Sequence, residues 1–347
     1  MKIAMVVPSL ANKGPVILVK DIIDQIQELN ENIQFTVFYF DEICELSFNC
    51  ECIKLDFKKK YLFQDFDIIH SHLYRPNKYI ARYKNYIVAM CVTTVHCNIF
   101  SVLYHTHNLI IAIMFSPLWL YYICKHDRIV TLTQNQKGIY SNLLGGQKIS
   151  VINNGRSVVP KEINEIDKHI LLDIPKDKII LGAFAGLTSI KGIDQVIKVL
   201  PYLKQCIFII IGDGKEKKRL QYLSKKQNVE EQCYFLGYRK DAYRYLKYVD
   251  VYMMPSVSEG FPLALIEAAQ YGCSCVCSDI KTFTEIWTEK EVSFFKLHDI
   301  VDLKRAILVA INKKNEKSNA IRKKYEANYT AKIMAQKYLE LYKQITT

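Results

Sequence analysis

The sequence has no apolar run of the length that a membrane-spanning helix requires. Its longest apolar stretch, Leu109 to Cys124, is interrupted by Ser116 and Pro117 and falls short of the roughly 20 residues needed to cross a bilayer. The first apolar run, Ile3 to Val7, stops at Pro8, whereas a secretory signal needs a longer apolar core and a small-residue cleavage site. We therefore expect a cytoplasmic protein that neither spans the membrane nor is exported.

Spacings typical of metal sites and of dinucleotide binding are also lacking. The cysteine clusters Cys50/Cys52 and Cys273/Cys275/Cys277 have neither the C-x-x-C spacing nor the accompanying histidine of a zinc site. Because the cysteines sit mainly in apolar, strand-like segments, we expect reduced, buried thiols and no metal site. No G-x-G-x-x-G follows a predicted strand, which disfavours a nicotinamide-dependent oxidoreductase.

What the sequence does contain indicates a globular protein of two domains. It has 347 residues, half of them hydrophobic, and a formal net charge of +12 that accumulates mostly after residue 150. This charge suits nucleotides, phospholipid surfaces or nucleic acid as partners. The basic runs at 215–219 and 322–324 carry no interleaved aromatic residues, so we expect solvated helix faces there and no nucleic-acid partner.

Short apolar runs alternate with longer amphipathic segments along the whole chain. This alternation is typical of β-α-β units and predicts an α/β protein with mainly parallel sheets. The pattern restarts after a turn signal at Asn153–Gly155 and a charged stretch over 160–178, which we expect to be the linker. Two doubly wound domains are therefore predicted, over 1–160 and 161–329, with a helix over 330–347 that packs back on the first domain. The predicted strands are Ile3–Val7, Gln34–Phe40, Ile68–His70, Val88–Val95, Arg128–Leu132, Ile179–Phe184, Cys206–Ile211, Cys233–Leu236, Val251–Met254 and Ser274–Cys277.

The most informative stretch, PSVSEGFPLALIEAA, follows the predicted strand Val251–Met254 and turns into a helical sequence. A strand–loop–helix junction of this kind points backbone N–H groups at the loop and favours an anion there. Glu259 lies in the loop and Glu267 in the helix, on the order of 10 Å apart along its axis. That is too far for the carboxylate pair of a retaining hydrolase, which needs about 5 Å. Because Glu267 is flanked by apolar residues, an unpaired charge there is costly, and we infer a ligand hydroxyl as its partner.

In this context the spacing from Glu259 to Glu267 resembles the E-x7-E motif of the family 4 retaining glycosyltransferases of the GT-B fold. The resemblance implies two Rossmann-like domains that face a central cleft. It further implies transfer of a hexose-type sugar from a nucleotide diphosphate sugar, with UDP as the expected nucleotide, to a glycan or lipid-linked acceptor in surface polysaccharide biosynthesis. No metal or other cofactor is implied. The other segments that resemble the family, in order, are Asp67–His72, Thr94–His96, Val151–Gly155, Lys191–Gly192, Gly212–Gly214 and Phe235–Gly237.

The resemblance also implies roles for residues on the donor side. Glu259 is expected to contact the hydroxyls of the donor sugar, and Glu267 to accept hydrogen bonds from the ribose hydroxyls. Lys191 is expected to neutralise the diphosphate, where negative charge develops as the glycosidic bond breaks. The amides expected near the sugar and the diphosphate are those of Gly260, Phe261 and Leu263.

Further positions are assigned roles by the same resemblance. Gly14 occupies the turn after the first strand, where the family approaches the diphosphate, and Gly212 lies in the loop beside the nucleotide base. His96 ends a predicted strand, at the edge where ligands bind in open α/β sheets, and is expected to contact the transferred sugar. His72 is expected on an acceptor-side loop, whereas His70 is expected in the core.

Two positions depart from the family pattern. Many members have an arginine five residues before the lysine, where this chain has Gly186, so one phosphate-binding cation is missing. Either Lys191 acts with another basic residue, or the donor binds more weakly than is usual in the family. Ser274 replaces the usual proline before a strand, which we expect to be a local change.

Two other functions are compatible with the same architecture. A GT-B relative that epimerises or phosphorolyses sugars shares the nucleotide or phosphate cleft but transfers no sugar to an acceptor. Outside the enzymes, a two-domain sugar-binding protein closes on its ligand like a hinge, although export would be expected for that class.

The segment 109–124 is open to two interpretations. Its aromatic residues and the following Lys125 and His126 give it the composition of an interfacial helix. It also fits a buried helix that precedes the strand at Ile129. We expect burial for most of it, with peripheral contact at the cytoplasmic face of the inner membrane if the acceptor is lipid-linked.

Overall fold

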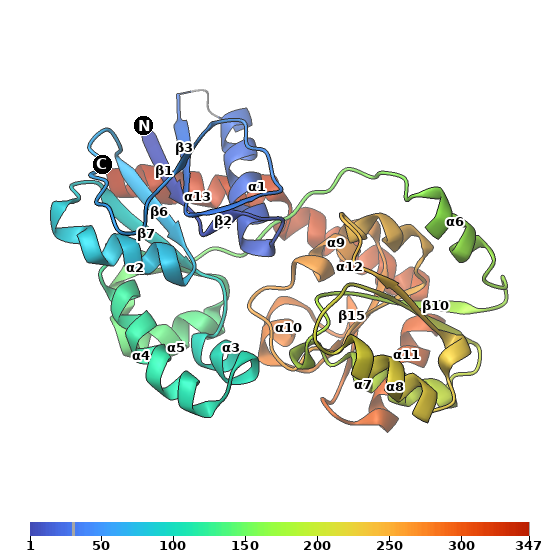
Figure 1. The fold of residues 1–347 in the computed structure, drawn as a ribbon. Coiled ribbons are helices and arrows are strands. Elements are labelled where there is room, and N and C mark those ends of the chain that lie inside the picture. Colours follow the sequence, from blue (N-terminus) through green and yellow to red (C-terminus); the bar gives the residue numbers. More distant parts are fainter. Residues whose placement is uncertain (30–31, 347) are drawn as a thin grey trace. The chain divides into compact units, whose positions relative to one another are not determined.

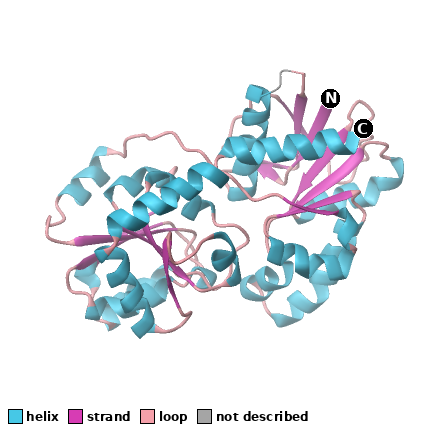
Figure 2. Cartoon of the chain, turned by 180° about the vertical axis from the view of Figure 1, so that it is seen from behind, coloured by secondary structure: helices cyan, strands magenta, loops and turns pink. Residues whose placement is uncertain are grey.

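The computed structural model describes residues 1–29 and 32–346, which form two compact units (Figures 1 and 2). The first unit comprises Met1–Arg156 together with Tyr329–Thr347, and the second comprises Ser157–Asn328. These borders lie slightly before the predicted residues 160 and 329. Each unit has its own parallel sheet with helices packed on it, so the predicted α/β class with two Rossmann-like halves is confirmed.

Within its described residues, the first unit has a seven-stranded sheet of order β5-β3-β1-β6-β7-β8-β9, with all neighbours parallel. Its central strands are buried on both faces, which explains their nearly continuous apolar sequences. The strands are β1 (Lys2–Val6), β3 (Gln34–Tyr39), β5 (Glu51–Lys54), β6 (Ile68–His72), β7 (Met90–Val95), β8 (Arg128–Thr131) and β9 (Ile149–Val151), with a separate pair β2 (Ser9–Leu10) and β4 (Asp41–Cys44). The α-helices are α1 (Gly14–Leu29), α2 (Tyr74–Tyr83), α3 (Ile99–Thr106), α4 (Leu109–Cys124), α5 (Gln134–Leu144) and α13 (Ala331–Thr346).

The second unit, all of which is described, has a six-stranded parallel sheet of order β12-β11-β10-β13-β14-β15. Its apolar core packs the buried faces of the central strands against α7 and α11. The strands are β10 (Ile179–Phe184), β11 (Cys206–Ile211), β12 (Cys233–Gly237), β13 (Val251–Met254), β14 (Ser274–Ser278) and β15 (Val292–Phe295). The α-helices are α6 (Glu165–Leu172), α7 (Ile193–Val199), α8 (Lys217–Lys226), α9 (Leu263–Tyr271), α10 (Lys281–Ile286), α11 (Ile300–Asn312) and α12 (Lys314–Asn328).

Each strand predicted from the sequence is present in the structure, with small shifts at the ends. The strands that the pattern missed in the two main sheets, β5, β9 and β15, are all edge strands. An edge strand is short and pairs on one side only, so it carries too few residues for a clear apolar pattern. In β5, for example, the sequence ECIK is mostly exposed.

The stretch 160–178, predicted to be a linker, instead contains α6, which is fastened to the second unit. Asp167 on α6 is fully buried and accepts a hydrogen bond from Arg239 Nη2 at 2.8 Å, and it also bonds Arg239 Nε and the hydroxyl of Tyr245. These partners hold the pKa of the Asp167 carboxyl down at about 2, with Arg239 as the main cause. The buried carboxyl of Asp167 therefore anchors this stretch to the second unit, so it is not a free connection.

The C-terminal helix α13 completes the first unit. It packs against α1 on the face of the sheet opposite α2. From α13, the hydroxyl of Tyr342 bonds His70 Nδ1 at 2.6 Å, and the hydroxyl of Tyr338 bonds Thr94 Oγ1 at 3.0 Å. All four side chains are buried, so the last helix of the chain satisfies polar groups at the centre of the first sheet.

A glycine beside the start of this helix gives a test of that packing. A Cβ at Gly155 would lie 2.1 Å from the carbonyl oxygen of Thr330, which is backbone and has little room to move. Gly155→Ala is therefore expected to lower the free energy of unfolding by about 1–3 kcal/mol, measured by urea denaturation. The matched control is Gly138→Ala in α5, where a Cβ meets nothing within 4 Å. That change should leave stability unchanged or raise it, and an equal loss in both variants would contradict the close approach.

Candidate active site

The strand order of the second sheet reverses beside β10. From β10 the chain builds β11 and β12 on one side, and it then returns to build β13, β14 and β15 on the other. Loops that leave the carboxyl ends of β10 and β13 therefore separate at this point, where open parallel sheets bind their ligands. Lys191 lies in the loop after β10, and Glu259 lies in the loop after β13.

An ion pair joins these two loops. Lys191 Nζ donates to Glu259 Oε1 at 2.7 Å, and the same oxygen accepts a hydrogen bond from Ser256 Oγ at 2.7 Å. The side chain of Glu259 is 10% exposed and that of Lys191 is 27% exposed. Glu259 is thus held from two sides, whereas the ammonium group of Lys191 remains accessible to an anionic ligand.

The loops can approach each other because of a glycine and a buried glutamine. Gly192 has a φ of 62°, and a Cβ there would lie only 2.0 Å from the carbonyl oxygen of Pro255. Gln195, 3% exposed, donates from Nε2 to that same oxygen at 2.9 Å. The backbone N–H of Val257 also donates to the carbonyl of Ile190 at 2.8 Å. These contacts fix the positions from which Lys191 and Glu259 project.

The loop that carries Glu259 leads directly into helix α9. Pro262 is the N-cap residue of α9, and Gly260, Phe261 and Leu263 surround the start of the helix. The first N–H groups of a helix carry partial positive charge and suit an anion. Thr282 Oγ1 donates to the carbonyl of Glu259 at 3.0 Å, which supports the loop from α10.

Glu267 lies farther along α9, where four of its neighbours are buried. Its own side chain is half-buried. The pKa of Tyr252 on β13 lies well above its ordinary value, mainly because of burial, and the negative charge of Glu267 adds to the increase. The Glu267 carboxylate is therefore close enough to β13 to act on Tyr252, rather than being directed into open solvent.

Two glycines near β10 and β11 differ in what surrounds them. Gly212 has a φ of 141°, and a Cβ there would lie 1.9 Å from the carbonyl oxygen of Ala185, so this turn requires glycine. At Gly186, by contrast, the atom nearest to where a Cβ would lie is the carbonyl oxygen of Asp213, at 4.0 Å. The position at which the arginine of the family pattern is missing thus has room for a side chain.

The first sheet has a reversal of its own, between β1 and β6. Gly14 is the first residue of α1, which follows the loop after β1. His72 is the last residue of β6, and His96 directly follows β7. His72 and His96 thus lie at the carboxyl ends of the neighbouring strands β6 and β7, and Gly14 lies beyond the carboxyl end of β1, the other neighbour of β6.

His72 and His96 contact each other. His72 Nδ1 lies 2.9 Å from His96 Nε2, so one ring donates to the other. His72 is fully buried, and in the described part of the chain its Nε2 has no hydrogen-bond partner. Burial lowers the pKa of His96 to about 4 and that of His72 well below its ordinary value, so both rings are neutral near pH 7. The prediction that His72 lies on a loop is wrong, because β6 extends to it.

Sequence reasoning missed the residues that hold the candidates in place. Ser256 lies three residues before Glu259 in the same motif, so its hydroxyl could have been considered as a partner. For Gln195 and Thr94, no nearby residue in the sequence indicated a hydrogen-bond partner. Their partners, Pro255 and Tyr338, are distant in sequence and become neighbours only in the folded chain.

Among residues 1–29 and 32–346, no group of three or more His, Cys, Asp or Glu side chains is arranged to hold a metal ion. In the same ranges, no helix combines the length and the apolar character needed to cross a bilayer.

Comparison with known sequences points to one family. Residues 165–327 match the family described as Glycosyl transferases group 1. The O-antigen biosynthesis glycosyltransferase WclY of Escherichia coli is 30% identical over 358 aligned residues, which cover 99% of both chains. The UDP-Gal:alpha-D-GlcNAc-diphosphoundecaprenol alpha-1,3-galactosyltransferase of Escherichia coli is 28% identical over 65% of this chain and 60% of its own.

Comparison with solved structures shows the same fold. Anabaena HepE, in a complex with UDP and glucose, superposes with a TM-score of 0.82 over 99% of this chain and 100% of its own. The two sequences are only 16% identical, so this likeness concerns the fold alone.

The buried histidines of the first unit predict a loss of stability in acid. His70, His72 and His126 are buried, and burial holds each pKa below its ordinary value, to about 4 for His126. Between about pH 6.5 and 4 the unfolded chain therefore binds protons that the folded chain does not, and stability falls as the pH falls. Each residue contributes up to about 1.4 kcal/mol per pH unit in this window.

Urea denaturation at pH 7 and pH 5 measures this effect. Trp119 reports on the first unit if Trp287 of the second is replaced by phenylalanine. The urea midpoint should fall clearly between the two pH values, and His107→Gln, which changes an exposed histidine, should leave the decrease unaltered. An unchanged midpoint would show that the three rings are not held neutral.

Proposed function

The chain belongs to the group 1 glycosyl transferases and is a glycosyltransferase of the GT-B fold; on this basis we propose that it is a retaining hexosyltransferase that uses a UDP-sugar. The observation that carries the proposal is the pairing of Lys191 with Glu259 where the second sheet reverses its order. The relatives named above act in O-antigen synthesis or on a diphosphoundecaprenol-linked sugar, and HepE binds UDP and glucose. We accordingly propose a lipid-linked glycan of surface polysaccharide biosynthesis as the acceptor.

In the proposed donor complex, Lys191 pairs with the donor diphosphate instead of with Glu259. The ammonium group of Lys191 and the first amides of α9 bind the diphosphate, because both offer positive charge to an anion. Glu259 then accepts hydrogen bonds from hydroxyls of the donor sugar while Ser256 continues to hold its carboxylate. Binding the diphosphate thus releases Glu259 for the sugar.

The nucleoside lies along α9 in this proposal. Glu267 accepts hydrogen bonds from the two ribose hydroxyls through its half-buried carboxylate. The turn at Gly212 brings backbone close to Ala185 and leaves the base beside the carboxyl end of β11. Uracil is proposed from the comparison with UDP complexes, not from a side chain of this turn.

The proposed chemistry relies on charge and positioning. Breaking the glycosidic bond leaves negative charge on the diphosphate, which Lys191 and the start of α9 stabilise without a metal ion. The acceptor hydroxyl attacks the face from which the diphosphate departs, and its proton passes to a diphosphate oxygen. Retention follows, because the new bond forms on the side of the old one.

On the first unit, His96 is proposed to contact the transferred sugar and His72 to position it. A neutral imidazole can donate one hydrogen bond and accept another, so the bond to His72 fixes the ring orientation of His96. Gly14, at the start of α1, is proposed to let backbone approach the donor diphosphate. We propose that transfer takes place at the cytoplasmic face of the membrane, where a lipid-linked acceptor is accessible.

Two conservative substitutions test the donor site. Glu267→Gln should raise the Kd for UDP about tenfold or more, because a charged acceptor of ribose hydrogen bonds is lost. Glu259→Gln should chiefly lower kcat, because its bonds to the sugar hydroxyls serve the transfer. Calorimetry with UDP and radiolabelled sugar transfer to membrane extracts measure the two effects.

The matched control is Glu230→Gln, which changes an exposed carboxylate of the same unit. Loss of folding in both site variants, but not in the control, would show that the two carboxylates are structural. Turnover of a UDP-sugar into an epimer or a sugar phosphate, with no transfer, would favour the rival enzyme classes.

The open position at Gly186 provides an independent test. Gly186→Arg adds a cation on the loop that leads to Lys191 and should lower the Kd for a UDP-sugar about three- to tenfold. Gly186→Ala controls for the backbone change and should have little effect, whereas Gly186→Glu should weaken binding. Equal affinity of the arginine and alanine variants would place the diphosphate away from this loop.

A further inference from the structure

Helix α4 exposes apolar side chains along one continuous face. Residues 110, 113, 114, 117, 118 and 121 are all exposed, and their spacing follows the helical period. The largest exposures are 68% for Ile110, 66% for Met114 and 57% for Ile113. The helix contains no charged residue between Leu109 and Cys124. The prediction that most of this segment is buried is therefore wrong.

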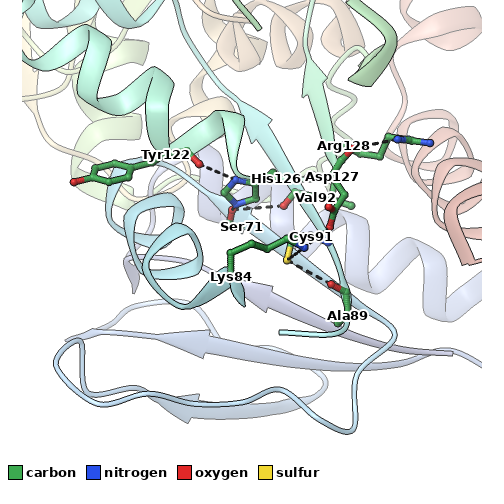
Figure 3. A network of polar contacts seen from close by, with 9 residues as sticks. All are labelled: Ser71, Lys84, Ala89, Cys91, Val92, Tyr122, His126, Asp127 and Arg128. Atoms are coloured by element: carbon green, nitrogen blue, oxygen red, sulfur yellow. Dashed lines mark hydrogen bonds and ion pairs between the residues drawn. The ribbon is translucent and has the colours of Figure 1, made fainter. Parts of the chain in front are cut away.

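The opposite face of α4 packs against α2 and α3, and the end of the helix is tied to the sheet. Ala112, Ser116 and Ile123 are buried there. At the end of the helix, the carbonyl of Tyr122 bonds His126 Nδ1 at 3.1 Å, and His126 Nε2 bonds Ser71 Oγ of β6 at 2.9 Å (Figure 3). The exposed face thus belongs to a firmly packed helix and is not the consequence of a loose segment.

A basic pocket adjoins the C-terminal end of this face. Its volume is about 470 Å³, and α2, the following 3-10 turn and the end of α4 line it. Tyr121 and Tyr122 form its aromatic side, and its basic side chains are Lys78, Arg82, Lys84 and Lys125. Lys84 is bound to Asp127 at 2.5 Å (Figure 3), whereas the other three form no ion pair within the described residues.

We propose that the exposed face of α4 and the basic pocket together form a surface that docks on a bilayer containing anionic phospholipid. The apolar face enters the interfacial region of the bilayer, and the pocket receives a headgroup phosphate. Tyr121 belongs to both parts, and Lys125 Nζ lies 5.0 Å from the centre of its ring, so the apolar and cationic elements are adjacent. The proposal rests on the proposed function only in that a lipid-linked acceptor gives the enzyme a reason to bind membrane.

The charge of this surface favours an anionic bilayer over a second copy of the chain as its partner. An interfacial helix combines an apolar face with aromatic and basic residues at its border, which is the arrangement found here. A second copy of this chain would bring another set of unpaired cations toward the pocket, which carries no carboxylate among its lining residues. A surface of anionic phosphates complements both parts at once.

Vesicle flotation with the full chain tests the proposal. The protein should float with vesicles of phosphatidylcholine and phosphatidylglycerol, bind at least about tenfold more weakly to phosphatidylcholine alone, and dissociate as salt is raised. Ile110→Asp with Ile113→Asp should abolish flotation, and Lys78→Glu with Arg82→Glu should reduce partitioning about tenfold or more.

Two matched controls accompany these variants. Val301→Asp replaces an apolar side chain that is 81% exposed on α11, and Lys225→Glu with Lys226→Glu reverses an exposed basic pair on α8. Neither should change flotation. Absence of flotation by the wild type, or equal losses in the α8 and pocket variants, would overturn the proposal. So would conversion of a dimer to a monomer by the α4 variant, seen by light scattering, without loss of flotation.

Binding of UDP by the same variants separates this inference from the proposed function. The α4 and pocket substitutions lie in the first unit, outside the residues assigned to the donor, and should leave the Kd for UDP unchanged. Flotation without UDP binding would contradict the proposed function alone. UDP binding and sugar transfer without flotation would contradict the docking surface alone.

Discussion

The candidate donor site depends on how closely two loops can approach where the second sheet reverses its order. The loops after β10 and β13 meet because Gly192 has no side chain to collide with Pro255 and because Gln195 bonds the same carbonyl. Only then do Lys191 and Glu259 come within hydrogen-bond distance. A cation and an acid held in this way give one site both a partner for phosphate and a partner for hydroxyl groups.

In the first unit, burial keeps several histidines in and beside the sheet neutral. His70 receives its partners from Thr94 and from Tyr342 of the C-terminal helix. Within the described residues, the His72 side chain forms a hydrogen bond only with His96, so the orientations of the two rings are linked. The last helix of the chain thus completes the polar core beside which His96 lies, and the first unit depends on both ends of the sequence.

Helix α4 shows that apolar composition does not determine burial. Only one side of the helix has a partner in the fold, since α2 and α3 cover a limited width. The other side carries equally apolar residues and remains exposed, next to a basic pocket in which only Lys84 forms an ion pair within the described residues. Such a surface is costly in water unless it has a partner.

From the amino-acid sequence alone, the fold class, the central strands and the segments that carry Lys191, Glu259 and Glu267 could be predicted. This was possible because buried parallel strands are continuously apolar and because strand–loop–helix junctions have recognisable turn residues. The sequence did not predict three features, namely the edge strands β5, β9 and β15, the docking of α6 through Asp167, and the burial of His72. These features, like the contact of Lys191 with Glu259 and the exposed face of α4, depend on which distant segments become neighbours. Only tertiary packing decides that, because the residues of a local segment do not specify which distant segment will pack against it.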